Sequence, residues 1–277
     1  MSFGNWLIAK IGRWLRRNTA PSRSYLCDFD RIRYELRPGD VLLIEGRNHI
    51  SNVIKQVTQS PWTHSALYIG RLHDIDDPSL RTELIKFYKG QPDNQLIIES
   101  VLGKGTVVTD FNYYKNEHIR ICRPQGLTRT DAQKVTAFAI QRLGREYDIR
   151  HIFDLFRFLF PWALLPRQWR SSIFETNAQK PTHDICSSMI AEAFASVKFP
   201  ILPILVRDTK KGIQIINRNP KLFTPSDFDY SPYFHIIKYP FLDIAGRTSY
   251  SELPWKEEEL VKLDQNDFPP DTSKKNN

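Results

Sequence analysis

Cysteine is scarce in this sequence, and long apolar runs are missing from it. The 277 residues include three cysteines, Cys27, Cys122 and Cys186. Such an odd, low number argues against a framework of disulfide bonds and favours a reducing compartment. No stretch reaches the roughly 20 consecutive apolar residues of a membrane-spanning helix. The N-terminus lacks an apolar segment with a small-residue cleavage site, so no secretory signal is predicted and we expect a cytoplasmic protein.

Motifs for metals and nucleotides are also missing. The pairs His73-Asp74 and His183-Asp184, the latter close to Cys186, are the best zinc ligands that the chain offers. Neither Cys-x-x-Cys nor His-Glu-x-x-His spacing accompanies them, so we expect no metal. The glycine patterns of Walker and dinucleotide-binding loops do not occur, and we expect no cofactor. A basic face with interleaved aromatic residues, as nucleic-acid binding requires, is not evident either.

Positive charge is concentrated at the N-terminus. The formal net charge is +8, and residues 1–24 carry five cations and no acidic residue. Within them, residues 3–17 place apolar side chains, including Trp6 and Trp14, at helical spacing opposite the cations. This pattern favours a helix on an anionic membrane surface, which would place the protein at the inner membrane face. Docking on the domain edge and an organellar presequence are the alternatives.

The remaining chain is expected to form one domain over 34–250, followed by a polar, partly disordered tail at 251–277. Consecutive strand signals, separated by turns, indicate an antiparallel sheet or half-barrel in an α+β fold. Residues 71–94 are polar and read as an insertion. Residues 152–166 are the most apolar stretch, and they predict either a buried core helix or a lid that faces a membrane. Strands are predicted at 41–44, from 64, 94–101, 103–111 and 118–124, and helices at 50–59, from Thr128 and from Cys186.

Cys186 has the sequence context of a reactive thiol. It follows a short polar loop and begins the amphipathic segment "CSSMIAEAF". The first turn of a helix carries unpaired N–H groups and partial positive charge, which favour a thiolate and a developing oxyanion. A buried packing cysteine is the alternative reading, and it suits Cys122 within the alternating strand "HIRICRP".

A thiolate nucleophile requires an imidazole partner, and the imidazole requires a polar group that orients it. His64 stands at the entrance of the strand in "SPWTHSALYIG". Glu99 lies in the middle of the apolar strand "LIIESV", where an unpaired carboxylate is costly. His64 and Glu99 on neighbouring strands would therefore satisfy each other.

These segments, together with "RPGDVLLIEG", "LGREYD" and "DICSSMIAEAF", resemble the circularly permuted, NlpC-type papain-like amidases of the YiiX/YaeF-like group. In that group the histidine strand precedes the cysteine helix. The resemblance covers roughly 37–200. It implies a permuted papain-like fold in which a small antiparallel sheet packs against the helix that starts at the cysteine. It also implies Cys186 as nucleophile, His64 as base and Glu99 as the orienting residue.

Around this site, Trp62 is a candidate wall of the cleft, and Tyr147 and Ser187 are candidate substrate contacts. The resemblance implies hydrolysis of an amide or ester through a covalent acyl-enzyme, with a peptide as the first substrate class. A more distant similarity to the lecithin:retinol acyltransferase group implies a lipid-directed thioesterase, phospholipase or acyltransferase instead. A third interpretation is a membrane-peripheral binding module in which Cys186 is unreactive. The oligomeric state is not predicted.

Overall fold

The computed structural model describes residues 27–47, 49–101, 104–145, 187–208 and 212–240. The predicted N-terminal helix at 3–17, the apolar segment 152–166 and the tail 251–277 lie outside the described residues, as do Tyr147 and Cys186.

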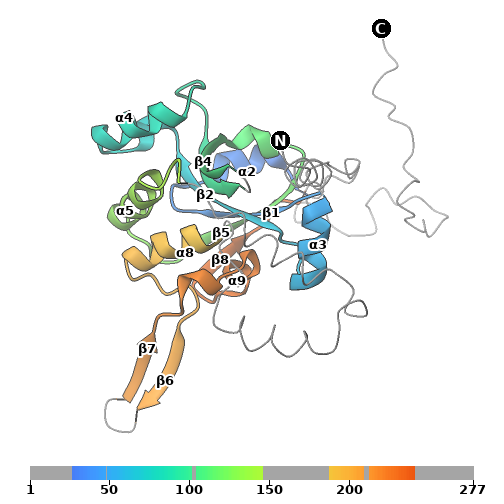
Figure 1. Cartoon of the computed structure of the whole chain (residues 1–277), viewed down its shortest axis with the longest axis vertical. Coiled ribbons are helices and arrows are strands. Elements are labelled where there is room, and N and C mark those ends of the chain that lie inside the picture. Colours follow the sequence, from blue (N-terminus) through green and yellow to red (C-terminus); the bar gives the residue numbers. More distant parts are fainter. Residues whose placement is uncertain (1–26, 48, 102–103, 146–186, 209–211, 241–277) are drawn as a thin grey trace, which may run out of the picture.

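The centre of the domain is a six-stranded antiparallel sheet in the order β4-β3-β2-β1-β5-β8 (Figure 1). Strands β1 to β4, which follow one another in the sequence, are direct neighbours in the sheet, as the sequence predicts. The last strand, β8, comes from the C-terminal region and pairs with β5. The mixture of this sheet with separate helices confirms an α+β fold. The strands are β1 Val41–Glu45, β2 His64–Gly70, β3 Leu96–Val101, β4 Gly105–Asp110, β5 His118–Pro124 and β8 Phe234–Ile237.

Both faces of the sheet are covered, and a separate apolar core lies on each. Successive side chains of a strand point to opposite faces. In β2, Leu67 and Ile69 therefore join one core, whereas Ala66 and Tyr68 join the other. We call the first the α8 core and the second the α2 core. Because both faces are buried, β1 and β2 consist almost wholly of apolar residues, a pattern typical of strands without a solvent-facing side.

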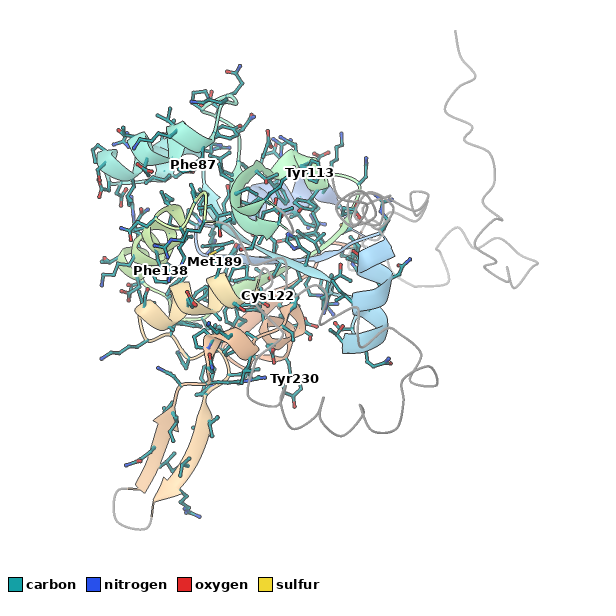
Figure 2. All side chains as sticks on the ribbon, viewed as in Figure 1. Phe87, Tyr113, Cys122, Phe138, Met189 and Tyr230 are labelled. Atoms are coloured by element: carbon teal, nitrogen blue, oxygen red, sulfur yellow. The ribbon has the colours of Figure 1, made fainter. Side chains whose placement is uncertain are left out.

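The α8 core takes its helical side chains from α4 (Pro78–Phe87), α5 (Arg129–Ile140), α8 (Ser187–Ser196) and α9 (Pro225–Tyr230). Met189 of α8 and Cys122 of β5 both belong to it (Figure 2). Cys122 is fully buried, as expected for a packing cysteine. The α2 core lies under α2 (Phe29–Glu35) and a 3₁₀ turn, η2 (Phe111–Tyr114), with Phe29 stacked on Phe111.

Helix α5 begins where its cap residue predicts. The Thr128 hydroxyl accepts a hydrogen bond from the backbone N–H of Asp131 at 3.1 Å, which satisfies one of the donors at the start of the helix. Beyond the helix, Gly144 adopts φ = +76°, a left-handed conformation that glycine tolerates best. Its N–H donates to the carbonyl of Thr106 at 2.9 Å, so the end of the helix is fastened to β4.

The segment 71–94, predicted as a polar insertion, contains α4 and contributes to the core. Asp77 caps α4 by accepting from the N–H of Ser79 at 2.7 Å. The side chain of Leu84 is fully buried in the α8 core. This segment is therefore packed on the domain through one apolar face, and its remaining side chains are mostly exposed.

A buried ion pair fixes the turn that precedes β1. Asp40 is only 1% exposed, and Arg123 of β5 donates to both of its carboxylate oxygens, from Nε at 2.9 Å and from a terminal nitrogen at 2.8 Å. The backbone N–H of Arg37 also donates to Asp40. Burial raises the pKa of Asp40, and the guanidinium of Arg123 opposes that effect. The pair thus ties the "RPGD" turn to β5, the strand that lies next to β1.

The hairpin β6 (Ile204–Asp208) and β7 (Gly212–Ile216) stands apart from the main sheet and projects from the body of the domain (Figure 1). Among the described residues, no helix is both long and apolar enough to cross a membrane.

Replacing Arg123 by Met should destabilise the domain strongly, because the carboxylate of Asp40 would stay buried without its main donor. Loss of one partner of a buried pair typically costs about 3–5 kcal/mol of unfolding free energy, measurable by urea denaturation. The control is Arg129→Met, which removes an exposed ion pair with Asp76 and should change stability by less than about 1 kcal/mol. Equal losses in the two variants would contradict a structural role for the buried pair.

Candidate active site

His64 and Glu99 form the centre of the candidate site. Strands β2 and β3 are neighbours, with Ala66 opposite Glu99, so the side chain of His64 reaches Glu99 diagonally across the two strands. The distance from His64 Nε2 to Glu99 Oε2 is 2.5 Å. The Glu99 side chain is 1% exposed and that of His64 is 19% exposed. One end of the pair is therefore sealed in the fold, while the imidazole keeps contact with the surface.

Tyr114 completes this arrangement from η2. Its hydroxyl donates to the same Oε2 of Glu99 at 2.5 Å, and its ring lies roughly parallel to that of His64 with centroids 6.1 Å apart. Asp110 ends β4 and accepts from the N–H of Asn112 at 2.8 Å, which turns the chain into η2 and carries Tyr114 back to the site. Sequence reasoning missed Tyr114; the Asp-x-Asn turn after a strand is the signal that was available.

The surroundings of Glu99 keep its carboxyl ionised. Burial alone would raise the pKa of Glu99, but the hydrogen bond and positive charge of His64 act against it, together with hydrogen bonds from Thr109 and Tyr114. The net result is a lowered pKa. A carboxylate can only accept hydrogen bonds, so a neutral His64 presents its Nε2–H to Glu99 and its basic lone pair at Nδ1. The pair has the features of an oriented general base.

Helix α8 and the His64–Glu99 pair are associated with opposite faces of the sheet. Residues of α8 pack in the α8 core, whereas His64 and Glu99 share the strand parity of Ala66 and Ile97 in the α2 core. His64 is, however, the first residue of β2. It therefore stands at one end of the strand that α8 contacts.

Two residues that were predicted to contact the substrate are buried and bonded to other residues of the fold. Trp62 is 2% exposed, donates from Nε1 to Asp229 at 3.2 Å and lies beneath the guanidinium of Arg120. Ser187 is also buried, and its hydroxyl donates to the carbonyl of Phe223 at 2.5 Å. These contacts give both residues structural roles, and their contact with a substrate stays a prediction. Tyr147 and Cys186 lie outside the described residues.

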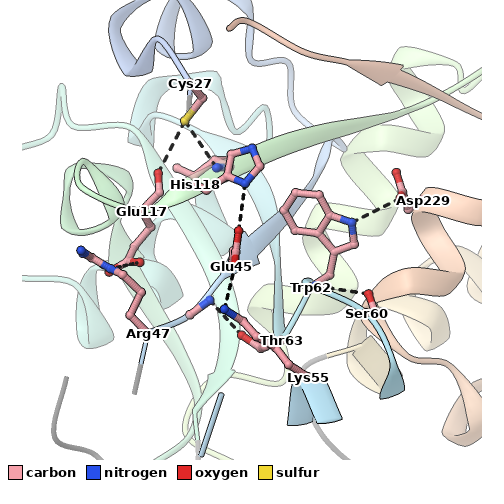
Figure 3. A network of polar contacts seen from close by, with 12 residues as sticks. Cys27, Glu45, Arg47, Lys55, Ser60, Trp62, Thr63, Glu117, His118 and Asp229 are labelled. Atoms are coloured by element: carbon pink, nitrogen blue, oxygen red, sulfur yellow. Dashed lines mark hydrogen bonds and ion pairs between the residues drawn. The ribbon is translucent and has the colours of Figure 1, made fainter. Parts of the chain in front are cut away.

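A second charged cluster lies beside the site and was not predicted (Figure 3). Glu45, at the end of β1, accepts from Lys55 of α3 (His49–Thr58) at 2.8 Å and pairs with Nδ1 of His118 at 3.1 Å. The hydrogen bond from His118 is the largest influence on the pKa of Glu45, and with Lys55 it outweighs burial and lowers that pKa to about 2. The rings of His118 and Trp62 are 5.3 Å apart. The cluster thus joins β1, α3 and β5 next to the entrance of β2.

Arg47 and Glu117 extend this network with two parallel hydrogen bonds of 2.8 Å each. Cys27 lies behind Glu117, where its sulfur approaches the carbonyl of Glu117 and the N–H of Ile119 at 3.5 Å each. Burial raises the pKa of the Cys27 thiol, and it raises that of Cys122 well above the ordinary value. Within the described part of the chain, no group of three or more His, Cys, Asp or Glu residues is arranged to hold a metal ion.

Comparison with known proteins agrees with the motifs. Residues 35–156 match the family model described as permuted papain-like amidases, YaeF/YiiX, family C92. This matched part of the chain is similar to the permuted papain-like amidases. The match contains His64 and Glu99, supports a cysteine hydrolase as the general class of enzyme, and fits a permuted papain-like fold. Cys186 lies beyond the matched residues.

Among solved structures, the chain is similar to the metalloprotein YiiX from Escherichia coli O157:H7, with 13% identity and a TM-score of 0.42. The similarity covers 73% of this chain and 97% of that one. No curated protein matches the chain.

Replacing Tyr114 by Phe should raise the pKa of Glu99 relative to the wild type, because one donor to its carboxylate is lost. Hydrogen bonds to charged groups contribute about 1.5–3 kcal/mol, so the unfolding free energy should fall by an amount of that order. Carboxyl titration by NMR and urea denaturation measure the two effects. Tyr113→Phe is the matched control, since Tyr113 is 75% exposed. An unchanged Glu99 titration would show that Tyr114 does not support the carboxylate.

Replacing Glu45 by Gln should make the domain less sensitive to acid. The pKa of Glu45 is about 2 in the folded protein against an ordinary value of 4.5, so its ionised form stabilises the fold above pH 4.5. That contribution is lost as the pH falls from 4.5 towards 2. The difference in unfolding free energy between wild type and variant should therefore shrink over this range. A difference that does not vary with pH would contradict the ion-pair role.

Proposed function

We propose that the protein is a cysteine amidase that hydrolyses an amide bond of a peptide, with Cys186 as nucleophile, His64 as general base and Glu99 as the residue that orients His64. The observation that carries this proposal is the buried, hydrogen-bonded His64–Glu99 pair within the region that matches the amidase family. The imidazole of this pair is 19% exposed, which allows it to exchange protons with a group at the surface.

The proposed reaction follows from the orientation of the imidazole. His64 accepts the thiol proton of Cys186 at Nδ1, and the thiolate attacks the carbonyl carbon of the substrate. Backbone N–H groups in the first turn of α8 stabilise the resulting oxyanion. The imidazolium then donates its proton to the leaving amine as the C–N bond breaks, which leaves a thioester on Cys186. Water, deprotonated by His64, attacks the thioester and releases the acid and the free thiol. Glu99 stays ionised throughout and stabilises the imidazolium.

The other two cysteines are poor nucleophiles. Cys122 is fully buried, and burial raises the pKa of its thiol. Cys27 is half-buried, its pKa is also raised by burial, and its sulfur is engaged by the backbone around residues 117–119. Only the thiolate form of cysteine is strongly nucleophilic, so both environments oppose catalysis. This leaves Cys186, which the sequence puts at the start of a helix.

Cysteine labelling tests the proposed nucleophile without knowledge of the substrate. With iodoacetamide at about pH 6, an activated Cys186 should be alkylated at least ~10-fold faster than an ordinary thiol of pKa near 8.5, as peptide mapping by mass spectrometry can measure. His64→Ala should remove the advantage and Glu99→Gln should reduce it. Cys27 and Cys122 in the same molecules are internal controls. If Cys186 is alkylated slowly, or at the same rate in the wild type and in His64→Ala, Cys186 is not the activated nucleophile. The non-catalytic binding module would then remain.

Activity assays separate the substrate classes. The wild type should release amine from small acyl-peptide amides, whereas Cys186→Ala should abolish turnover while leaving the thermal midpoint nearly unchanged. Acyl thioesters and phospholipids should be tested in parallel with the same two proteins. Cys186-dependent turnover of the lipid substrates alone would replace peptide amidase by the lipid-directed reaction. Turnover that persists in Cys186→Ala would contradict both.

A further inference from the structure

The β6–β7 hairpin exposes apolar side chains on both of its faces. Leu205 is paired with Ile215 on one face, and Ile204 with Ile216 on the other. All four side chains are exposed, Leu205 and Ile215 to 62% each. Ile213, on the same face as Leu205, is 70% exposed. The hairpin projects from the domain, and its side chains extend to either side of its ribbon (Figure 2). An isolated two-stranded hairpin is marginally stable in water, so these residues require a partner that covers them.

Cations flank this apolar zone. Residues 204–221 contain five of them, Arg207, Lys210, Lys211, Arg218 and Lys221, against the single acid Asp208. Their surplus of four charges is half of the formal net charge of the chain. Arg218 at the base is bonded to Asp227 and to the carbonyl of Leu222. Arg207, near the tip, has no ion pair within the described residues. In the described part of the chain, Arg207 near the tip is therefore unpaired, Arg218 at the base is paired, and the apolar side chains lie between them.

We propose that the β6–β7 hairpin is a membrane-contact element that lies in the interface of an anionic lipid bilayer. A hairpin that lies in the plane of the interface turns one apolar face, that of Leu205, Ile213 and Ile215, towards the acyl chains. Lysine and arginine at the two ends match lipid phosphates, because their stems cross the apolar boundary while their charges stay in the headgroup layer. Strands of five residues reach about 17 Å at ~3.4 Å per residue, while a membrane-spanning strand needs about 9–11 residues. The hairpin therefore lies in the interface and does not cross the bilayer.

The lipid contact does not depend on Cys186 or on the reaction proposed above. It would hold the domain at a membrane surface whatever the substrate, and the hairpin is distinct from the predicted N-terminal helix at 3–17.

Vesicle binding tests the proposal with the full-length chain. We compare how strongly the wild type and the triple variant Leu205→Ser/Ile213→Ser/Ile215→Ser bind to phosphatidylcholine vesicles. Each protein is tested on vesicles with and without phosphatidylglycerol. The variant should bind anionic vesicles at least about tenfold more weakly, since three partly buried aliphatic side chains are removed from the lipid. Arg207→Glu should weaken binding to the anionic vesicles only. Tyr34→Ser/Ile85→Ser is the matched control, because both residues are exposed but lie elsewhere, and it should bind as the wild type does.

Three results would overturn the proposal. Equal vesicle binding by the wild type and the triple variant would assign any lipid contact to another segment, such as residues 3–17. A wild-type dimer in light scattering that the triple variant dissociates, without vesicle binding, would identify a second copy as the occupant. A markedly lower thermal midpoint of the triple variant, again without vesicle binding, would show that the chain itself covers the hairpin.

Discussion

A carboxylate placed in the middle of a buried strand has to be supplied with hydrogen-bond donors, and much of this domain is arranged to supply them to Glu99. Strand β2 brings His64, η2 brings Tyr114, and β4 brings Thr109. Strand β2 and the continuous β4–η2 segment therefore meet at one carboxyl group. Their convergence fixes the register of β2, β3 and β4, because a slip by one residue would turn Glu99 towards the α8 core.

The same requirement recurs at two further acids, one buried and one half-buried. Asp40 is held by Arg123 of the neighbouring strand, and Glu45 is held by His118 and Lys55. In both cases the donor on the sheet comes from β5, which pairs with β1. Strand β5 thus supports the sheet through side-chain charges as well as through its backbone. Asp40 holds an arginine, whereas Glu99 and Glu45 each hold a histidine that begins a strand. The side chain of Glu99 is 1% exposed and that of Glu45 is 27% exposed, so Glu99 is the more deeply buried of these two carboxylates.

Local patterns sufficed to predict much of the sheet and part of the site. The alternation in "HIRICRP", the apolar runs of β1 to β3 and the Thr128 cap depend on neighbours in sequence, and the structure agrees with them. The proximity of His64 and Glu99 followed from the energetic cost of an unpaired carboxylate. Tyr114, the Glu45–His118 pair and the short strand β8 were not found, because each depends on a partner distant in sequence. The hairpin was missed since its strands, exposed on both faces, lack the alternation that marks a half-buried strand.

Strand β8 has a consequence for how the chain assembles during synthesis. It pairs with the outer edge of β5, which precedes it by about 110 residues, and the adjacent Tyr239 accepts the N–H of Asp28 at 2.8 Å. Until residue 239 has left the ribosome, the backbone groups along one edge of β5 have no strand to bind, and α2 lacks its C-terminal neighbour. An uncovered edge of this kind invites pairing with other chains. The domain therefore closes late, by joining the two ends of its described sequence, and nascent chains arrested before β8 should depend on chaperones to stay soluble.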